Sequence, residues 1–141
     1  MTVNAILAQK GHEVATASRT TSLGDVAAEL AHRRIGALVI VDDDSVCGIV
    51  SERDLVRHIA ANGATALSEP VSECMTAKVI SCAPAETIDN VMEKMTAGRF
   101  RHLPVLDGTK LVGIISIGDV VKRKIEQTER DAEELKRYIA G

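Results

Sequence analysis

One short stretch occurs twice in the chain and decides its fold. The first copy reads Gly48-Ile49-Val50-Ser51-Glu52-Arg53-Asp54, and the second reads Gly113-Ile114-Ile115-Ser116-Ile117-Gly118-Asp119. Around it, residues 23–58 align with residues 88–123 at a constant offset of 65 without a gap, and nine of the 36 aligned pairs are identical. An internal repeat of this length indicates two copies of one structural unit.

Hydrophobic periodicity predicts the same elements in each copy. In the first, a helix over 23–33 precedes two buried strands, 37–41 and 46–50, and a second helix runs from Ser51 to Asn62. The second copy repeats them as a helix over 88–97, strands over 103–106 and 111–115, and a helix from Ser116. A lead-in segment, residues 12–17 or 78–82, is predicted as the first strand of each copy.

One such unit alone would leave a face of its sheet bare. We therefore predict an α/β (α+β) fold in which two pseudo-symmetric β-α-β-β-α units pack through their sheets, with ligand clefts where the halves meet. Residues 1–141 form one module in this interpretation, with units over 12–62 and 76–126 and a helical extension over 127–141.

Composition narrows the functional class. The 141 residues are 45% hydrophobic and 26% charged, with a formal charge of −3, one Phe, one Tyr and no Trp. This balance predicts a globular protein and argues against nucleic-acid binding through phosphates or base stacking. No apolar run is long enough to span a bilayer, and the N-terminus lacks the pattern of a signal peptide, so a cytoplasmic location without membrane contact is expected.

Cysteine and histidine spacing argues against other classes of site. The three cysteines form no C-x-x-C pair, and no histidine has a partner at metal-ligand spacing, so neither a disulfide framework nor a metal site is expected. No motif of a hydrolase, metalloprotease or phosphate-binding loop is present. The chain is therefore not expected to be an enzyme.

Three motifs together resemble a known family. The doubled stretch, the run Arg101-His102-Leu103-Pro104-Val105, and Met75-Thr76 before the second unit are similar to paired CBS domains, the cystathionine β-synthase-type repeats of a Bateman module. The resemblance covers about residues 10–125, and the start at Lys10-Gly11-His12 is similar to small stand-alone bacterial members. It implies a regulatory module that binds an adenosine ligand (AMP, ADP, ATP, NAD or S-adenosylmethionine) in two related clefts.

The repeated Ser-x-x-Asp spacing suits such a ligand. It places a hydroxyl at the end of a strand and a carboxylate in the first turn of the following helix, at the same helix mouth. The carboxylate can accept hydrogen bonds from ribose hydroxyls. The hydroxyl and the free amides of the first turn can hold phosphate oxygens.

The resemblance implies two sites, residue by residue. In one, Asp119 would hold the ribose with help from Ser116, phosphate would face Arg101 and His102, and adenine would lie against Val14, Ala15, Ile35 and Gly36. In the other, Asp54 and Ser51 would take the ribose, Arg53 would reach phosphate, and the base would lie against Met75, Val79, Ile80 and Phe100. The two sets carry unequal phosphate-binding charge, so different affinities or ligands are expected.

Simpler interpretations of these residues remain open. Asp54 and Asp119 also fit ordinary helix N-terminal charges. Arg101 fits a solvated surface residue, His102 a structural histidine and Met75 core filler. On this alternative the protein is a structural or interaction protein that binds a client without nucleotide. A small enzyme acting on nucleotides is the remotest interpretation.

The last helix continues beyond the repeat with an apolar seam. The spacing is 4-3-4-3-4, through Val121, Ile125, Thr128, Ala132, Leu135 and Ile139. We expect this seam to contribute to a homodimer; the alternative is that it covers the chain's own core. An effector protein that senses the ligand is also expected, but its identity does not follow from the sequence.

Overall fold

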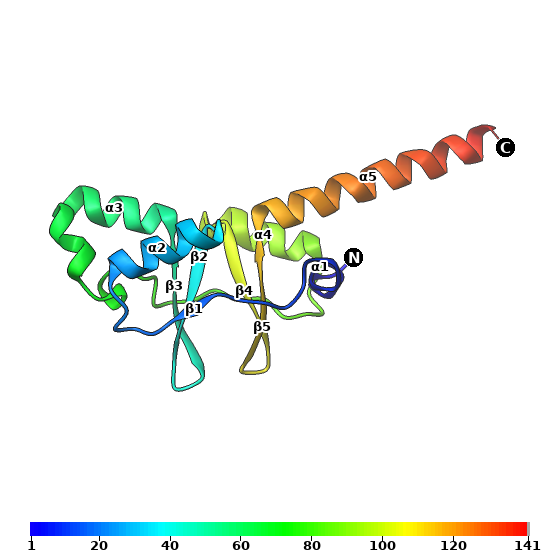
Figure 1. The fold of residues 1–141 in the computed structure, drawn as a ribbon. Coiled ribbons are helices and arrows are strands. Elements are labelled where there is room, and N and C mark those ends of the chain that lie inside the picture. The colour runs from blue at the N-terminus through cyan, green and yellow to red at the C-terminus, as the bar shows by residue number, and fades with distance from the viewer. Residues whose placement is uncertain (141) are drawn as a thin grey trace.

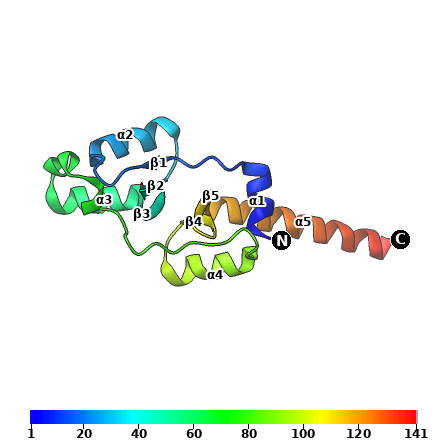
Figure 2. The same cartoon turned by 90° about the horizontal axis from the view of Figure 1, so that it is seen from below.

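Two similar halves lie side by side, and one long helix projects from the second (Figures 1 and 2). The computed structural model describes residues 1–140. The first half contains β1 (Thr16–Ala17), α2 (Leu23–Arg33), β2 (Ala37–Asp42), β3 (Ser45–Ser51) and α3 (Glu52–Asn62). The second contains α4 (Ile88–Gly98), β4 (His102–Asp107), β5 (Lys110–Ser116) and α5 (Ile117–Ala140). The predicted mixed α/β fold of two repeats with a long C-terminal helix is confirmed.

Side-chain caps begin the repeated helices. The hydroxyls of Ser22 and Thr87 accept hydrogen bonds from the amides of Asp25 and Asn90 at the starts of α2 and α4. Ser51 and Ser116 do the same for Asp54 and Asp119 at the starts of α3 and α5. Each cap satisfies one of the amides that a helix start leaves without a partner.

The sheets differ from the prediction in both lead-in segments, and of residues 12–17 only Thr16 and Ala17 form a strand. In the first half β1 pairs parallel to β2, and β2 pairs antiparallel to β3. In the second half only β4 and β5 form a sheet, and the lead-in 78–82 makes a single bridge, Cys82 to Val105. The expected strand is lost because Pro104 stands where Val39 donates its amide to Ala15, and proline has no N–H to donate.

Each half is completed by a segment that precedes the other half in the chain. Helix α1 (Val3–Lys10) precedes the first half but buries Val3, Ile6 and Leu7 in the core of the second. The short helices η1 (Ala64–Ser68) and η2 (Val71–Glu73) lie between the halves in sequence, and their Ala66 and Val71 are buried in the first core. Helix α1 therefore crosses to the second half, whereas η1 and η2 pack on the half that they follow. Each core thus includes residues from outside the aligned repeat.

Two equivalent glycines, Gly48 and Gly113, let side chains from outside the repeat pack closely against the hairpins. A Cβ at Gly113 of β5 would lie 2.6 Å from Leu7 Cδ2, and a Cβ at Gly48 of β3 would meet Met75. Leu7 and Met75 thus pack directly onto backbone at matching positions of the two hairpins. Strands β3 and β5 also contact each other, which brings the helix starts of both repeats to the junction of the halves.

Helix α5 leaves the body soon after it begins. Val120 is buried, whereas every residue from 128 to 140 is exposed. Figure 1 shows this part of the helix extending away from both halves. Within residues 1–140, no helix combines the length and the apolar character that crossing a membrane requires.

Candidate functional site

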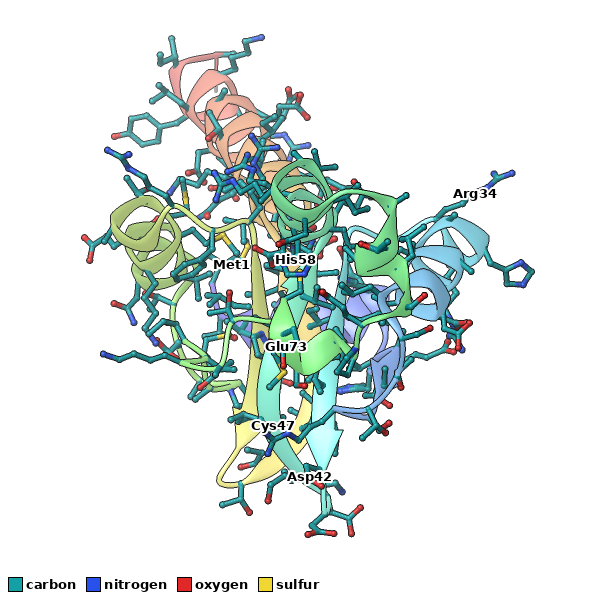
Figure 3. The ribbon with its side chains drawn as sticks, turned by 90° about the vertical axis from the view of Figure 1, so that its left-hand side faces the viewer. Met1, Arg34, Asp42, Cys47, His58 and Glu73 are labelled. Atoms are coloured by element: carbon teal, nitrogen blue, oxygen red, sulfur yellow. The ribbon has the colours of Figure 1, made fainter. Side chains whose placement is uncertain are left out.

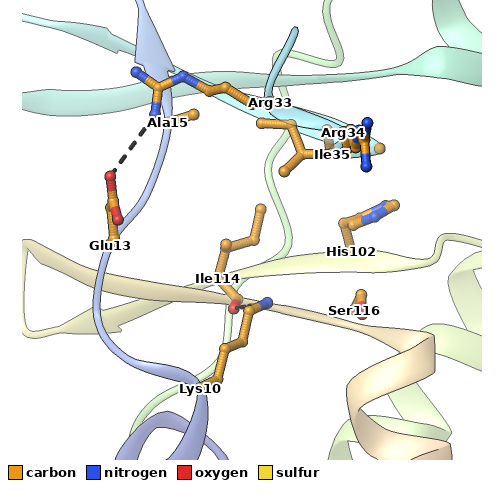
Figure 4. Close-up of a pocket in the computed structure, with 11 residues that line it drawn as sticks. Lys10, Glu13, Ala15, Arg33, Arg34, Ile35, His102, Ile114 and Ser116 are labelled. Atoms are coloured by element: carbon orange, nitrogen blue, oxygen red, sulfur yellow. Dashed lines mark hydrogen bonds and ion pairs between the residues drawn. The ribbon is translucent and has the colours of Figure 1, made fainter. Parts of the chain in front are cut away.

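Two clefts open at the junction of the halves. The first cleft has a volume of about 550 Å³ and receives residues from both repeats. Its wall includes Ala15, Ile35, Gly36 and Ala37 from the first half, Ile114, Ser116 and His102 from the second, and the charged residues Lys10, Glu13, Arg33 and Arg34 (Figure 4). It combines an apolar slot with charged side chains at its edge, which suits a ligand with one flat apolar part and one anionic part.

Lys10 places a positive charge at the edge of the first cleft. Its ammonium donates hydrogen bonds to Asp119 Oδ2 at 2.7 Å and to the carbonyl oxygen of Ile114 at 2.9 Å. Asp119 itself lines a smaller groove of about 210 Å³ between α1 and α5, and Lys10 lines both spaces. A ribose in the first cleft would therefore meet the ammonium of Lys10 before the carboxylate of Asp119.

The pKa of Asp119 reflects this contact. Partial burial acts to raise the pKa, but hydrogen bonds from Lys10 and the Ser116 amide, together with the positive charge of Lys10, outweigh burial and hold the pKa below its usual value. Asp119 is ionised at neutral pH.

The second cleft is larger and more cationic. It has a volume of about 700 Å³, and its apolar wall includes Ile49, Ile80 and Phe100. Five basic side chains line it against two acidic ones: Arg53, Arg57, Lys78, Arg99 and Arg101 against Glu52 and Asp54. Such an excess of positive charge in a concave surface attracts anionic groups.

Asp54 lies at the mouth of the second cleft without a basic partner. Ser51 donates to its Oδ2 from the amide at 2.9 Å and from the hydroxyl at 3.0 Å, and Asp54 returns an amide hydrogen bond to Ser51 Oγ. This reciprocal arrangement is a capping box for α3. Among residues 1–140 no hydrogen bond reaches Oδ1 of Asp54, so that oxygen is available to a ligand hydroxyl.

His102 and Gly36 belong to both clefts. A Cβ at Gly36 would lie 3.0 Å from Cε1 and Nε2 of the His102 ring, so the glycine lets the imidazole approach the backbone of the other repeat. Burial lowers the pKa of His102, and the positive charge of Lys10 lowers it further. The neutral form of the imidazole is therefore favoured at physiological pH, and His102 adds no positive charge to the clefts.

Most of the residues implied by the family resemblance lie on the two clefts. The first cleft brings together Ala15, Ile35, Gly36, His102 and Ser116, and the second brings together Ser51, Arg53, Asp54, Ile80 and Phe100.

The other implied residues lie elsewhere. Arg101 lies on the second cleft, although the sequence assigned it to the first. Met75 packs onto Gly48 and the first core, and Val14 and Val79 line neither cleft.

Several cationic residues on the clefts were not predicted. Lys10 is 109 positions from Asp119 in sequence, and no spacing rule connects them. Arg34 and Arg99 share a signal that the repeat did offer: they are aligned identical residues, and each ends its helix with a left-handed backbone, φ 55° and 56°. A non-glycine residue in that conformation is uncommon. Arg34, whose side chain extends outward from the end of α2 (Figure 3), lines the first cleft, and Arg99 lines the second.

No metal or disulfide chemistry accompanies the clefts in the described residues. No group of three His, Cys, Asp or Glu side chains within residues 1–140 is placed to hold a metal ion. Cys47, Cys74 and Cys82 are free thiols, and burial raises the pKa of Cys74 to about 11 and that of Cys82 to about 12. Both thiols are protonated and poorly nucleophilic at neutral pH.

Comparison with known proteins agrees with this architecture. The CBS domain family matches the chain twice, at residues 10–61 and 71–126. The mitochondrial CBS domain-containing protein CBSX3 of Arabidopsis thaliana is 33% identical over 122 residues, which cover 83% of this chain and 59% of that protein. The chain thus spans well under two thirds of that relative's length.

Solved structures match over nearly their whole length. The CBS-domain protein ATU1752 from Agrobacterium tumefaciens is 47% identical with a TM-score of 0.85, covering 87% of this chain and 92% of that one. The CBS domain pair of protein MJ0100, solved with 5-methylthioadenosine and S-adenosyl-L-methionine, is 27% identical with a TM-score of 0.80, covering 90% and 98%. A CBS domain protein from Pyrobaculum aerophilum, complexed with AMP, is 26% identical with a TM-score of 0.75, covering 84% and 89%.

Proposed function

The chain belongs to the CBS-domain family, and on that premise we propose that it is a non-catalytic regulatory module that binds an adenosine nucleotide. Two neighbours of the same fold were solved with adenosine ligands, which supports the ligand class. The observation that carries the proposal is the second cleft. There an aspartate with no basic partner among residues 1–140, an apolar wall and five basic side chains line one space.

Each part of the ligand has a suitable partner in the second cleft. The free Oδ1 of Asp54 accepts a ribose hydroxyl, while Ile80 and Phe100 offer an apolar surface for the adenine. Arg53 and Arg57 lie on the first two turns of α3, where the positive end of the helix dipole also favours anions. The charge excess favours a ligand with more than one phosphate, ADP or ATP, over AMP.

The two clefts differ in whether the aspartate of the Ser-x-x-Asp pair is already bound to a lysine. Asp54 accepts hydrogen bonds only from Ser51, whereas Asp119 is already neutralised by Lys10. The second cleft therefore fills first, and the first cleft binds more weakly because its ligand must displace or accommodate Lys10. The clefts draw residues from both halves, so a bound ligand stabilises one arrangement of the halves, and a partner protein senses that arrangement.

Thermal melting against AMP, ADP, ATP, NAD and S-adenosylmethionine, with GTP as control, tests the proposal. A ligand at 100 times its dissociation constant adds about 2.7 kcal/mol to the free energy of unfolding, which shifts the melting temperature by several degrees. We expect the largest shift with ADP or ATP and none with GTP. Protein freed of co-purified nucleotide that responds to no adenosine compound would contradict the proposal.

Variants then locate the site by calorimetric titration. Asp54→Ala is expected to weaken ADP binding at least about tenfold, because a ribose hydroxyl loses its charged acceptor. Asp25→Ala is the matched control: Asp25 follows the cap residue Ser22 by three positions, as Asp54 follows Ser51, but it lines neither cleft. Equal loss of binding in the two variants would mean a general effect on stability and not a ribose contact.

A further inference from the structure

Helix α5 carries an apolar face that nothing in residues 1–140 covers. The face consists of the six seam residues, all of them exposed: Val121, Ile125, Thr128, Ala132, Leu135 and Ile139. Leu135 is 59% exposed and Ile139 76%. Between residues 128 and 140 no side chain is buried, and a helical segment of this length is marginal in water without tertiary contacts. The seam therefore needs a partner.

The rest of residues 1–140 does not cover the seam. Where α5 touches the rest of the chain, it does so through other positions: Val120 is buried, and Arg123, Lys124 and Gln127 are half-buried. The seam lies away from these contacts, so it is open from the first turns of the helix to its end. A second helix can lie along its whole length.

The seam residues match a two-stranded coiled coil. In heptad terms Ile125, Ala132 and Ile139 occupy a positions, and Val121, Thr128 and Leu135 occupy d positions. A β-branched residue at a, with leucine at d, favours two parallel strands. Ile139 and Leu135 meet this rule in the last heptad, where the exposed apolar surface is largest.

The charges beside the seam select the orientation. In a parallel pair each g residue faces the e residue five positions later on the partner. Lys124 then faces Glu129, and Asp131 faces Lys136, so each pair is attractive and occurs twice by symmetry. Lys124 also donates to Asp89 of α4 at 3.0 Å in its own chain, so the Asp131–Lys136 pair carries more of the selectivity.

In an antiparallel pair that buries all six seam residues, the charges beside the seam repel each other. Positions e then face e, and g face g. Lys122 meets Lys136, Glu129 meets Glu129 and Asp131 meets Asp131, all like charges. An antiparallel shift by one heptad restores attraction but leaves seam residues uncovered at one end of each helix. Full burial and charge attraction coincide only in the parallel register.

We propose that α5 forms a parallel two-stranded coiled coil with the α5 of a second copy of this chain. Parallel pairing brings both helix starts to the same end of the dimer. Because Ser116, which lines the first cleft, immediately precedes α5, the first clefts of the two copies lie at the base of the shared coil. The proposal rests on the helix alone and does not depend on the identity of the ligand.

Sedimentation equilibrium of the full chain at low ionic strength tests the pairing. We expect a dimer, and Leu135→Glu should raise its dissociation constant by about a hundredfold or more, because two buried leucines are lost. Gln127→Glu adds the same charge outside the seam and should leave the constant nearly unchanged. A monomeric wild type, or a dimer insensitive to Leu135→Glu, overturns the proposal.

Charge reversal tests the orientation, because the two orientations predict opposite signs. Lys136→Glu places a carboxylate opposite Asp131 in the parallel pair and weakens it, and adding Asp131→Lys restores the dimer. In the antiparallel register Lys136→Glu meets Lys122 and strengthens the dimer. A stronger dimer with Lys136→Glu overturns the parallel assignment.

Cysteine cross-linking gives an independent measure of orientation. Ile139→Cys faces itself in a parallel pair and should form a disulfide-linked dimer under mild oxidation. In the antiparallel register residue 139 faces residue 121, about 27 Å along the helix from the other introduced thiol, and no disulfide forms. The wild type, with its three native cysteines, is the control, and an Ile139→Cys dimer that cannot be cross-linked contradicts the parallel coil.

Discussion

Asp54 and Asp119 hold equivalent positions in the two repeats, yet their carboxylates have different neighbours. Each binds the amide of the serine three residues before it and helps to cap its helix. Only Asp119 also receives an ammonium, from Lys10. The Ser-x-x-Asp pair therefore has a structural role in both repeats, and what differs between the two carboxylates is whether a lysine ammonium is already paired with them.

Removal of Lys10 changes how stability depends on pH. A carboxyl group whose folded pKa is lowered stabilises the protein above its unfolded pKa of about 4, and that contribution is lost as pH falls through the folded value. Lys10→Met removes both a hydrogen bond and the charge that lower the pKa of Asp119. We therefore expect the NMR-measured pKa of Asp119 to rise and the free energy of unfolding at pH 7 to fall by about 1 kcal/mol or less, since the pair is partly solvated.

Lys10→Arg is the matched control, because it keeps the positive charge beside Asp119. In that variant the pKa of Asp119 should stay below its usual value, and acidification from pH 7 to pH 3 should cost as much stability as in the wild type. The Lys10→Met protein should lose less over the same range. An unchanged pKa of Asp119 in Lys10→Met would show that the amide of Ser116 alone accounts for the shift.

Residue identities at the clefts could be predicted only where local sequence determines them. The Ser-x-x-Asp pairs recur within four residues, and the sequence located them at both helix starts. Lys10 was missed because its contact depends on how α1 crosses to the other half. Arg101 was assigned to the first cleft, but it lies on the second, because the cleft that a side chain at the junction lines depends on how the two halves pack and not on local sequence.

At the level of elements, α1 completes the hydrophobic core of the second half. Its residue Leu7 is fully buried and packs against the backbone at Gly113. The helix is also tied down at its start, where the Val3 amide donates to the carbonyl of Glu86 and the Asn4 amide to that of Pro84. The side chain of Lys10 at the other end of α1 reaches the first cleft, so the position of this helix couples the second core to that cleft.

Leu7→Ala should therefore destabilise the fold strongly. A fully buried leucine truncated to alanine typically costs about 2–5 kcal/mol, because the surrounding structure does not collapse into the space. Leu67→Ala is the control, since Leu67 is 40% exposed and should cost about 1 kcal/mol or less. Urea denaturation measures both, and similar losses in the two variants would mean that α1 is only loosely docked.

The repeated helices and hairpins were largely predictable, and the missing strand of the second half has a local cause. The apolar runs and caps of the repeat predicted α2 to α5 and both hairpins within one or two residues. The lead-in 78–82 was predicted as a strand by analogy with 12–17, but Pro104 removes the amide that would hold it. The repeat alignment transferred the strand from residues 12–17 to residues 78–82. It did not account for the backbone N–H that Pro104 lacks.

At the scale of the whole molecule, helix α1 crosses from the start of the chain to complete the core of the second half. This arrangement could not be predicted from the repeat, because α1 lies outside the aligned residues. The halves also meet at the junction, where Gly36 of one repeat faces His102 of the other and both residues line both clefts. A change at this contact should therefore affect two clefts, whereas Asp54 belongs to only one.

Gly36→Ala tests that shared contact. The added methyl group lies 3.0 Å from the His102 ring, so the ring, which lines both clefts, must shift by a few tenths of an ångström. We expect ligand affinity in both clefts to fall about five- to tenfold, in line with a modest overpacking penalty. His102→Ala in the same protein removes the clash, so the Gly36→Ala/His102→Ala variant should bind like His102→Ala alone. Calorimetry with an Asp54→Ala background separates the clefts, and a Gly36→Ala effect confined to one of them would show that the two clefts are not coupled through this contact.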